Sequence, residues 1–297
     1  MSALTAIART SRPPARRPTR AKVMPAVAWW VLCSAIALGF LGPVIVVILS
    51  SFKTTAEASS PNPTLFPTTW SLRNYTSLQG VGEGMLTYAG NSVVVALGTV
   101  IGTVIVATMA GYGFEKFGFY GRNAAFLAIV AMLMVPFQAV VTPLYLILDR
   151  MGLVNDFLGL TLVYITYQLP FAIFVMRNSF AAVPKALEEA ATLDGASSIR
   201  MLTDVMVPLV RPGLITVGLF AFFNAWNEFF AALILMSDQE HYTLPIALTL
   251  VQSSSFLGSI DWGLLQSSVV VSMVPSIIVY VVLQRYYAAG LLTGGVK

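Results

Sequence analysis

The sequence of 297 residues is 57% hydrophobic and 10% charged, with a mean hydropathy of +0.79 and a formal net charge of +4. One soluble core cannot remove that much apolar side chain from water, so the composition excludes a soluble globular protein and predicts an integral membrane protein. The one cysteine and one histidine exclude a disulfide framework, a thiolate metal site and a histidine-dependent triad. The sequence contains no G-x-x-x-x-G-K-[ST] motif, so any ATP that drives this protein binds to another chain.

Residues 1–25 are strongly basic and contain no acidic residue. The apolar run Ala26–Leu49 follows them and is too long for the core of a signal peptide. We therefore expect an uncleaved first span preceded by a disordered basic cytoplasmic tail, residues 1–25. A basic arm can also bind nucleic acid, but membrane orientation already explains the charge, and no nucleic-acid partner is expected.

Five further apolar runs approach the roughly 20 residues that a bilayer core requires. They are Ala89–Gly113, Ala124–Leu148, Leu158–Met176, Gly213–Met236 and Gln266–Leu283. With the N-terminus inside, all lysines and arginines except Lys53, Arg73 and Arg150 fall on the inner side. The positive-inside rule therefore predicts an all-α membrane protein with six transmembrane helices, both termini in the cytoplasm, and one six-span domain over residues 26–297.

The second run carries glycines at helical spacing. Gly98 and Gly102, extended by Ala110, form a small-xxx-small face. We interpret this face as a site where another helix of the same chain packs closely, in preference to a ligand site.

A polar island that begins at Pro184 separates the fourth and fifth apolar runs. Pro184 suits the start of a helix, and Gly195 suits a left-handed C-terminal cap. Ser197 or Ser198 can cap a second helix, which must stop before Pro208. The pattern predicts two short helices joined at a glycine. Small residues on the first helix would let the surface of another protein approach closely.

Glu189, Ala190 and Ala191 are followed at fixed spacing by Gly195 and Pro208. This order resembles the EAA loop of binding-protein-dependent ABC importer permeases. In that family the loop, here residues 182–213 between spans 4 and 5, is a cytoplasmic coupling element that docks on an ATPase subunit. The resemblance implies ATPase-coupling roles for Glu188, Glu189, Ala190, Ala191, Asp194, Gly195, Ala196 and Pro208.

The C-terminal segment Gly290–Lys297 and the segment Asn224–Phe229 resemble the second permease subunit of maltose-type carbohydrate importers. The resemblance implies a tail that contacts the ATPase dimer through Gly294, Gly295 and Lys297. It also implies partners: a second related permease subunit, two ATPase subunits that hold ATP and Mg, and an extracytoplasmic substrate-binding protein. That binding protein is expected to contact the outer segment Ser237–Leu265.

Polar side chains inside spans are costly in hydrocarbon, so they normally face the bundle or a wet cavity. Amides and carboxylates satisfy sugar hydroxyls, aromatic rings cover the apolar faces of sugars, and both kinds occur here. Interhelical hydrogen bonding is the alternative, which we prefer for the serines of the last span and leave open for Asn227 and Glu228. Asn224 and Glu228 are expected to share a helix face at i, i+4 spacing. The candidate translocation path consists of Gln138, Tyr164, Tyr167, Gln168, Asn224, Asn227 and Glu228.

These expectations combine into a permease subunit of an ATP-driven importer of carbohydrate, multi-pass in a bacterial cytoplasmic (inner) membrane, with no cofactor bound by this chain. A permease for a polyamine or a phosphate compound would carry a similar loop. An ion-coupled secondary transporter would show internal repeats and intramembrane carboxylates, whereas Glu228 is the only charged candidate well inside a span. An enzyme is not expected, because no nucleophile–base pair or metal cluster can be assembled from these residues.

Overall fold

The computed structural model describes residues 26–62, 64–254 and 260–294. The predicted basic tail and two predicted tail contacts, Gly295 and Lys297, lie outside these ranges. Every regular element of the described residues is a helix, which confirms the all-α prediction for them. Four described helices are long and apolar enough to cross a membrane: α1 (Ala26–Ser51), α4 (Met85–Lys116), α7 (Phe157–Ala181) and α14 (Trp262–Gly294).

The chain divides into two units, residues 1–45 and 46–297, with the boundary inside α1. In the first unit the described part of α1 exposes large apolar side chains such as Trp30 and Phe40. Because exposed apolar surface of this extent is unfavourable in water, it suits a helix that contacts lipid.

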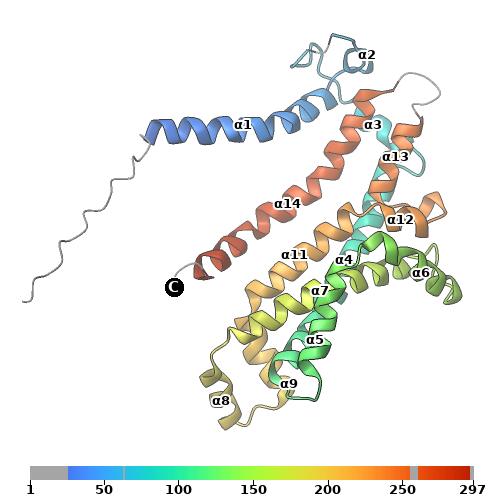
Figure 1. The fold of residues 1–297 in the computed structure, drawn as a ribbon. Helices are drawn as coiled ribbons and strands as arrows, with labels where there is room; N and C mark the ends of the chain where they lie inside the picture. The colour runs from blue at the N-terminus through green and yellow to red at the C-terminus, as the bar shows by residue number, and fades with distance from the viewer. Residues whose placement is uncertain (1–25, 63, 255–259, 295–297) are drawn as a thin grey trace, which may run out of the picture. The chain divides into compact units, whose positions relative to one another are not determined.

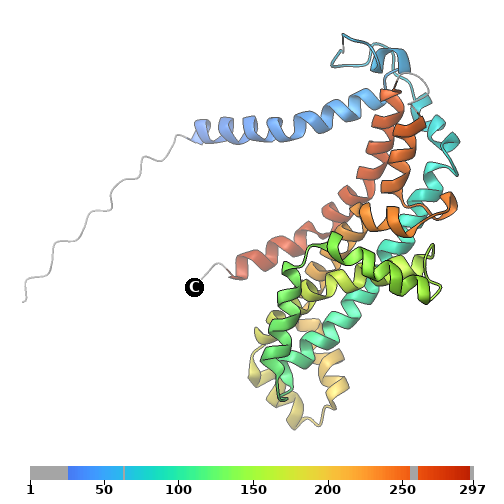
Figure 2. The ribbon, with the colours of Figure 1, turned by 45° about the vertical axis from the view of Figure 1, so that its right-hand side comes forward.

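The predicted third span bends sharply. The helices α5 (Arg122–Ala131) and η2 (Met132–Met134) meet α6 (Phe137–Arg150) at 106°, and Figure 2 shows this corner in green. Pro136 precedes α6 with extended backbone (φ −66°, ψ 132°), and it has no N–H with which to continue a helix. The apolar run Ala124–Leu148 is therefore not one straight helix but two helical segments that meet at Pro136.

The predicted fifth span, Gly213–Met236, is interrupted. The helix α11 (Arg211–Asn227) gives way to extended backbone at Glu228 (φ −72°, ψ 128°), and the short α12 (Phe230–Leu235) follows. The prediction of one continuous helix is therefore wrong at Glu228. Among the described residues the number of candidate spans rises from four to six if two bent helix pairs each form one span: Arg122–Met134 with Phe137–Met151, and Ser198–Leu209 with Arg211–Asn227.

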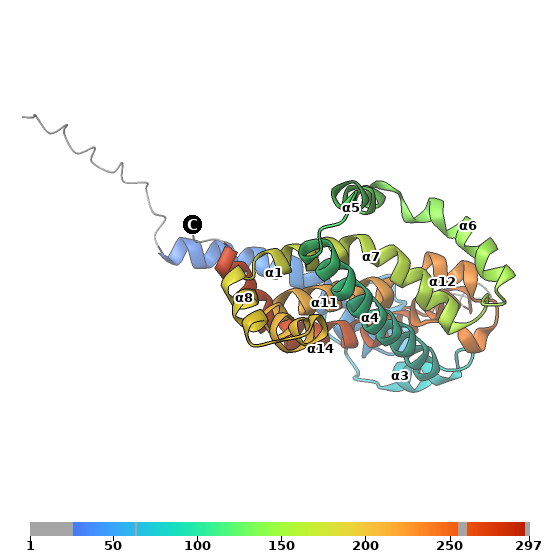
Figure 3. The ribbon, with the colours of Figure 1, turned by 90° about the horizontal axis from the view of Figure 1, so that it is seen from below.

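The helices α4, α7 and α11 pack against one another and form the centre of the unit 46–297, with α14 beside α11 (Figure 1). Seen from below, α5 and α6 lie on the α7 side of this bundle (Figure 3). Two short helices, α8 (Lys185–Leu193) and α9 (Ser198–Arg200), lie at one end, which we call the α8 end. At the opposite end, the α13 end, lie α2 (Thr55–Ala58), α3 (Arg73–Ser77), η1 (Leu78–Gly80), η4 (Gln239–His241) and α13 (Leu244–Ser254).

Two clusters of buried apolar side chains hold the bundle together, one toward each end. On α4 the clusters are separated by Thr99 and Thr103, and on α7 by Gln168, all of which are buried. The bundle is therefore polar near its middle and apolar on either side. A cavity that Thr99 and Gln168 help to line lies in this polar layer.

The segment between α1 and α4 is ordered by side chains that bond to backbone. Glu57 accepts hydrogen bonds from the Thr68 N–H, the Thr68 hydroxyl and the Thr64 hydroxyl, at 2.8–2.9 Å. The Thr68 N–H, together with these hydroxyls, lowers the pKa of the Glu57 carboxyl. Asn74 on α3 is buried and donates to the Ser51 and Lys53 carbonyl oxygens, each at 2.8 Å.

Glycines on α4 bring α7 close. A Cβ at Gly98 would lie 3.1 Å from Thr161 Cγ2, and a Cβ at Gly102 would overlap Ile165. A Cβ at Gly111 would lie 2.6 Å from Met176 Cβ and 2.9 Å from the Arg177 backbone nitrogen. The predicted small-residue face is therefore confirmed as a surface of helix packing.

Gly111→Ala is expected to destabilise the α4–α7 contact by about 1–3 kcal/mol, because the obstacle includes backbone that cannot move aside. Thermal unfolding in detergent measures the effect. Gly113→Ala on the same helix is the matched control, since a Cβ there meets nothing within 4 Å. Equal unfolding temperatures for the two variants would contradict the prediction.

Candidate functional site

A cavity of about 170 Å³ lies in the polar middle of the bundle. Its walls come from α4, α6, α7, α11 and the break between α11 and α12. The lining residues are Thr99, Phe137, Tyr164, Tyr167, Gln168, Phe223, Asn224, Asn227 and Glu228.

The carboxylate of Glu228 stabilises the break in the fifth span through hydrogen bonds. Its carboxylate accepts the Ala231 N–H at 3.0 Å and the Ala232 N–H at 3.2 Å, so it caps α12. The Tyr164 hydroxyl on α7 donates to the same carboxylate at 2.7 Å. Glu228 is therefore both a helix cap and a link between α7 and the α11–α12 break. Its carboxylate is occupied by the protein's own donors.

An amide pair forms a second link across the cavity wall. Asn224 Nδ2 on α11 donates to Gln168 Oε1 on α7 at 2.5 Å, and Gln168 is 3% exposed. Tyr167 is 46% exposed, and its ring centroid lies 4.4 Å from that of Phe137. The wall thus combines an amide pair, of which Gln168 is buried and Asn224 exposed, with an accessible aromatic face, and amides and aromatic faces are the two kinds of group that bind sugars.

Asn227 and Phe223 lie between two cavities. On one side is the cavity just described, and on the other is a wider one of about 410 Å³ between α11 and α14. The second cavity is lined by Phe223, Asn227, Val269, Ser272, Met273, Ser276 and Ile277. Asn227 is exposed, and its Nδ2 donates to the Phe223 carbonyl oxygen at 2.8 Å. A change of rotamer at either residue would therefore alter the wall of both cavities.

Six of the seven residues predicted for a translocation path line the first cavity. Gln138 does not, because it is exposed on α6 one position after the lining residue Phe137. The expectation that Asn224 and Glu228 share a helix face is wrong, since Glu228 lies outside α11, although both reach the cavity. Sequence reasoning missed Thr99, Phe137 and Phe223. The only sequence signal for Phe137 is Pro136, which places it at the corner of a bend.

The polar island forms the α8 end of the bundle. The helix α8 begins at Lys185, directly after Pro184, and Gly195 has the left-handed backbone that was predicted (φ 78°). The Ser197 hydroxyl accepts the Arg200 N–H at 3.4 Å and so caps α9. The prediction of two short helical segments joined at a glycine is confirmed.

The second helical segment does not stop before Pro208, so that prediction is wrong. α9 continues into the π-helical turn η3 (Met201–Met206) and then into α10 (Val207–Leu209), which contains Pro208. The i→i+4 hydrogen-bond ladder is already interrupted in η3, so the missing N–H of Pro208 breaks no regular α-helical bond. The 79° bend into α11 follows instead.

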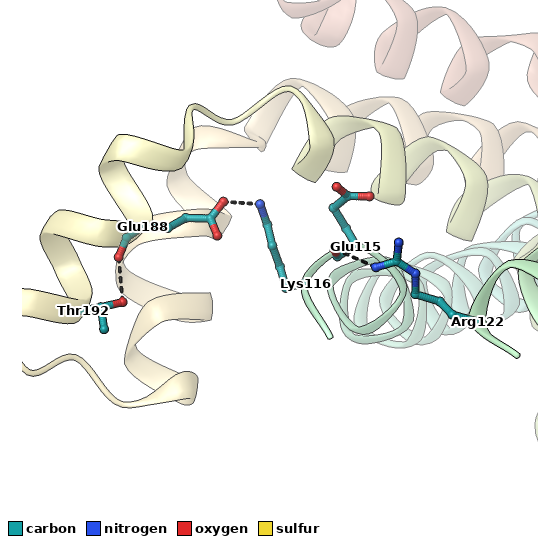
Figure 4. Close-up of polar contacts among 5 residues, drawn as sticks. All are labelled: Glu115, Lys116, Arg122, Glu188 and Thr192. Atoms are coloured by element: carbon teal, nitrogen blue, oxygen red, sulfur yellow. Dashed lines mark hydrogen bonds and ion pairs between the residues drawn. The ribbon is translucent and has the colours of Figure 1, made fainter. Parts of the chain in front are cut away.

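The two adjacent glutamates of α8 differ in surroundings. Glu188 forms an ion pair with Lys116 at the end of α4, with 24% and 14% of the two side chains exposed (Figure 4). Glu189 is exposed, as are Ala190, Asp194 and Gly195. Of the predicted coupling residues, Glu188 therefore bonds within the chain, whereas Glu189 is accessible to another molecule.

The model of a known protein family matches residues 102–292, which include α8 and most of the cavity wall. The family is described as the binding-protein-dependent transport system inner membrane component. The chain belongs to this family. The match also explains the apolar helices, because members of the family are membrane permeases.

Two relatives of this permease match almost end to end. It is 32% identical to the diacetylchitobiose uptake system permease protein DasC of Streptomyces coelicolor, over 90% of this chain and 96% of the relative. It is 30% identical to the arabinooligosaccharides transport system permease protein AraQ of Halalkalibacterium halodurans, over 93% of this chain and 99% of the relative. Its fold matches a chain of a bacterial ABC transporter that imports the polysaccharide alginate. The TM-score is 0.77 at 24% identity, over 88% and 96% of the two chains.

Proposed function

We propose that this permease is a subunit of an ATP-driven importer that moves a carbohydrate into the cytoplasm of a bacterium. In this proposal residues 26–297 form one domain that crosses the cytoplasmic membrane six times, with the bent α5–α6 and broken α11–α12 segments each belonging to one span. The α8 end and both termini face the cytoplasm, as the distribution of lysine and arginine favours. ATP and Mg bind to partner subunits, and the chain itself catalyses no reaction.

The exposed face of α8 is the observation that carries the proposal. Leu187 and Leu193 on α8 are 43% and 89% exposed, Ile199 on the following α9 is 76% exposed, and Glu189 on α8 is exposed as well. Exposed large apolar side chains together with an exposed charge favour a protein partner. Ala190 is small and exposed, so it lets a partner approach the helix backbone. An ATPase subunit docked here would move α8 when it closes on ATP.

A carbohydrate is the substrate class that best fits the cavity. Tyr167 offers an exposed ring, and the amides of Asn224 and Asn227 offer donors and acceptors for hydroxyl groups. Two end-to-end relatives carry the names of oligosaccharide uptake systems, which supports the same class.

The remaining partners are those that the resemblance to binding-protein-dependent importers implies. A second, related permease would complete the passage, two ATPase subunits would dock at the cytoplasmic side, and a substrate-binding protein would dock at the α13 end. The described part of the outer segment presents acidic residues there. Asp238 is fixed by Asn155 at 2.7 Å, and Asp261 accepts the Leu264 N–H at 3.0 Å.

ATP hydrolysis by the assembled complex in proteoliposomes is expected to require both the binding protein and sugar. Diacetylchitobiose and arabinooligosaccharides are the carbohydrate probes, and spermidine and glycerol phosphate are the controls for the other solute classes. Uptake should continue when ionophores abolish proton and sodium gradients, because the energy comes from ATP. Uptake that needs an ion gradient and proceeds without ATPase subunits would contradict the proposal.

A further inference from the structure

The last turn of α4 carries two oppositely charged residues that pair with different elements. Glu115 Oε2 lies 3.5 Å from Arg177 Nε on α7. Lys116, the next residue, forms its ion pair with Glu188 on α8 (Figure 4). The end of α4 is therefore bonded to the chain on both sides of the junction between α7 and α8.

That junction is a short turn. α7 ends at Ala181 and α8 begins at Lys185, with Val183 buried between them and its N–H bonded to the Phe180 carbonyl oxygen at 3.2 Å. A helix attached through such a turn can tilt about it unless another contact restrains it. The Lys116–Glu188 pair lies beyond the turn, so it is placed to restrain that tilt.

The α4 side of the pair rests on a rigid base. Tyr112, one turn before Lys116, is 8% exposed. Its ring makes edge contacts with Phe117 at 5.7 Å and Phe180 at 5.5 Å between centroids. This aromatic cluster fixes the end of α4 against α7. A displacement of α8 would therefore stretch the Lys116–Glu188 ion pair before it disturbed the aromatic packing around Tyr112.

The two glutamates of α8 have separate tasks in this arrangement. Successive residues of a helix point about 100° apart, and here Glu188 points toward α4 whereas Glu189 is exposed. We propose that Lys116 is a positioning residue that, through Glu188, sets the orientation of α8 and transmits its displacement to α4. This inference rests on the proposed coupling role of α8.

The path from the pair to the cavity is a single helix. Thr99 of α4 lines the cavity, and it precedes Lys116 on an unbroken helix by about 25 Å at the usual helical rise. A rigid helix carries an axial or tilting displacement over that distance without intermediate contacts. The Lys116–Glu188 pair therefore connects the partner-facing helix to a wall of the cavity.

A double-mutant cycle in the complete importer tests the inference. Lys116→Met and Glu188→Gln each remove one charge of the pair. We expect each to lower the amount of sugar moved per ATP hydrolysed by roughly five- to tenfold, while the ATPase stays bound. The double variant should be no worse than the poorer single variant, because both act through one contact. Lys116→Arg should retain most of the ratio, since it preserves the pair.

The Glu115–Arg177 pair supplies the matched control. Its side chains are 25% and 23% exposed, close to the exposure of the tested pair, but it joins α4 to α7 and not α4 to α8. Glu115→Gln should leave the ratio of sugar to ATP near that of the wild type, even if the unfolding temperature falls. A general loss of stability is thereby separated from a loss of coupling.

Three outcomes would overturn the inference: wild-type ratios in both single variants, additive losses in the double variant, or an equal loss in Glu115→Gln. Glu189→Ala in the same assay distinguishes this failure from failure of the proposed function. If Glu189→Ala weakens coupling and the Lys116 variants do not, α8 docks on the ATPase without using this pair. If the ATPase does not copurify even with the wild-type chain, the proposed function itself fails.

Discussion

Replacing Glu228 by alanine is expected to lower uptake at least tenfold and to destabilise the folded permease. The change removes the acceptor for the Ala231 and Ala232 N–H groups and for the Tyr164 hydroxyl. Ala231 and Ala232 are fully buried. Leaving buried donors unsatisfied costs about 1–3 kcal/mol each, so a total of several kcal/mol is expected. Thermal unfolding and sugar uptake of the purified complex measure the two effects.

Asn227→Ala, one residue away, is the informative comparison. Asn227 is exposed between the two cavities and bonds only locally, to the Phe223 carbonyl oxygen, among the contacts of the described residues. Its removal should lower uptake by roughly two- to tenfold, the value of one hydrogen bond to substrate, with unfolding temperature and assembly near wild type. Glu228→Gln keeps an acceptor oxygen and should lie between the two. Equal losses of assembly and uptake in Asn227→Ala and Glu228→Ala would contradict a separate role for Asn227 in the passage.

The sequence predicts the α8 end well because the signals there are local. Gly195 adopts positive φ, and Ser197 caps the following segment, since both depend on residues within a few positions. The glycine face of α4 is equally readable, because close helix packing needs only small residues at helical spacing. These features require no knowledge of which helices meet.

The break at Glu228 could not be read from the chain in the same way. The apolar pattern continues through Gly213–Met236, so periodicity favours one helix. The helix ends because the Glu228 carboxylate caps α12 and bonds to Tyr164, which lies 64 residues away in the sequence. The bend at Pro136 could be predicted in part, since a proline in a span permits a kink but does not fix its angle.

The functional residues show the same difference between local signals, which the sequence carries, and contacts between distant residues, which it does not. Composition alone identified Tyr164, Gln168 and Asn224 as candidate residues of the translocation path, because polar groups in spans rarely face lipid. It could not distinguish Gln138, which is exposed, from these residues that line the cavity. Nor could it separate Glu188 from Glu189, because the difference depends on Lys116, which is 72 residues from Glu188 along the chain.

Changes in α8 are expected to detach the ATPase or to uncouple hydrolysis from uptake, while the chain remains folded in the membrane. Glu189→Ala removes an exposed carboxylate that, in the proposed complex, is partly desolvated against a basic group of the ATPase. Loss of one member of such a pair costs more than loss of an exposed one, so we expect roughly tenfold or greater weakening of ATPase attachment. Lys185→Ala, also exposed on α8, is the control for a general change of surface charge.

Gly195→Val tests the angle between α8 and the following segment. A Cβ at Gly195 would meet nothing within 4 Å, so the expected cost is conformational: a β-branched residue at φ 78° costs about 1 kcal/mol or more. Gly195→Asn is the matched variant, because asparagine tolerates left-handed backbone and should retain most of the coupling. Copurification of the ATPase and the ratio of sugar moved to ATP hydrolysed measure the effect. If Glu189→Ala and Gly195→Val both keep the ATPase and transport at the wild-type rate, α8 is not the coupling element.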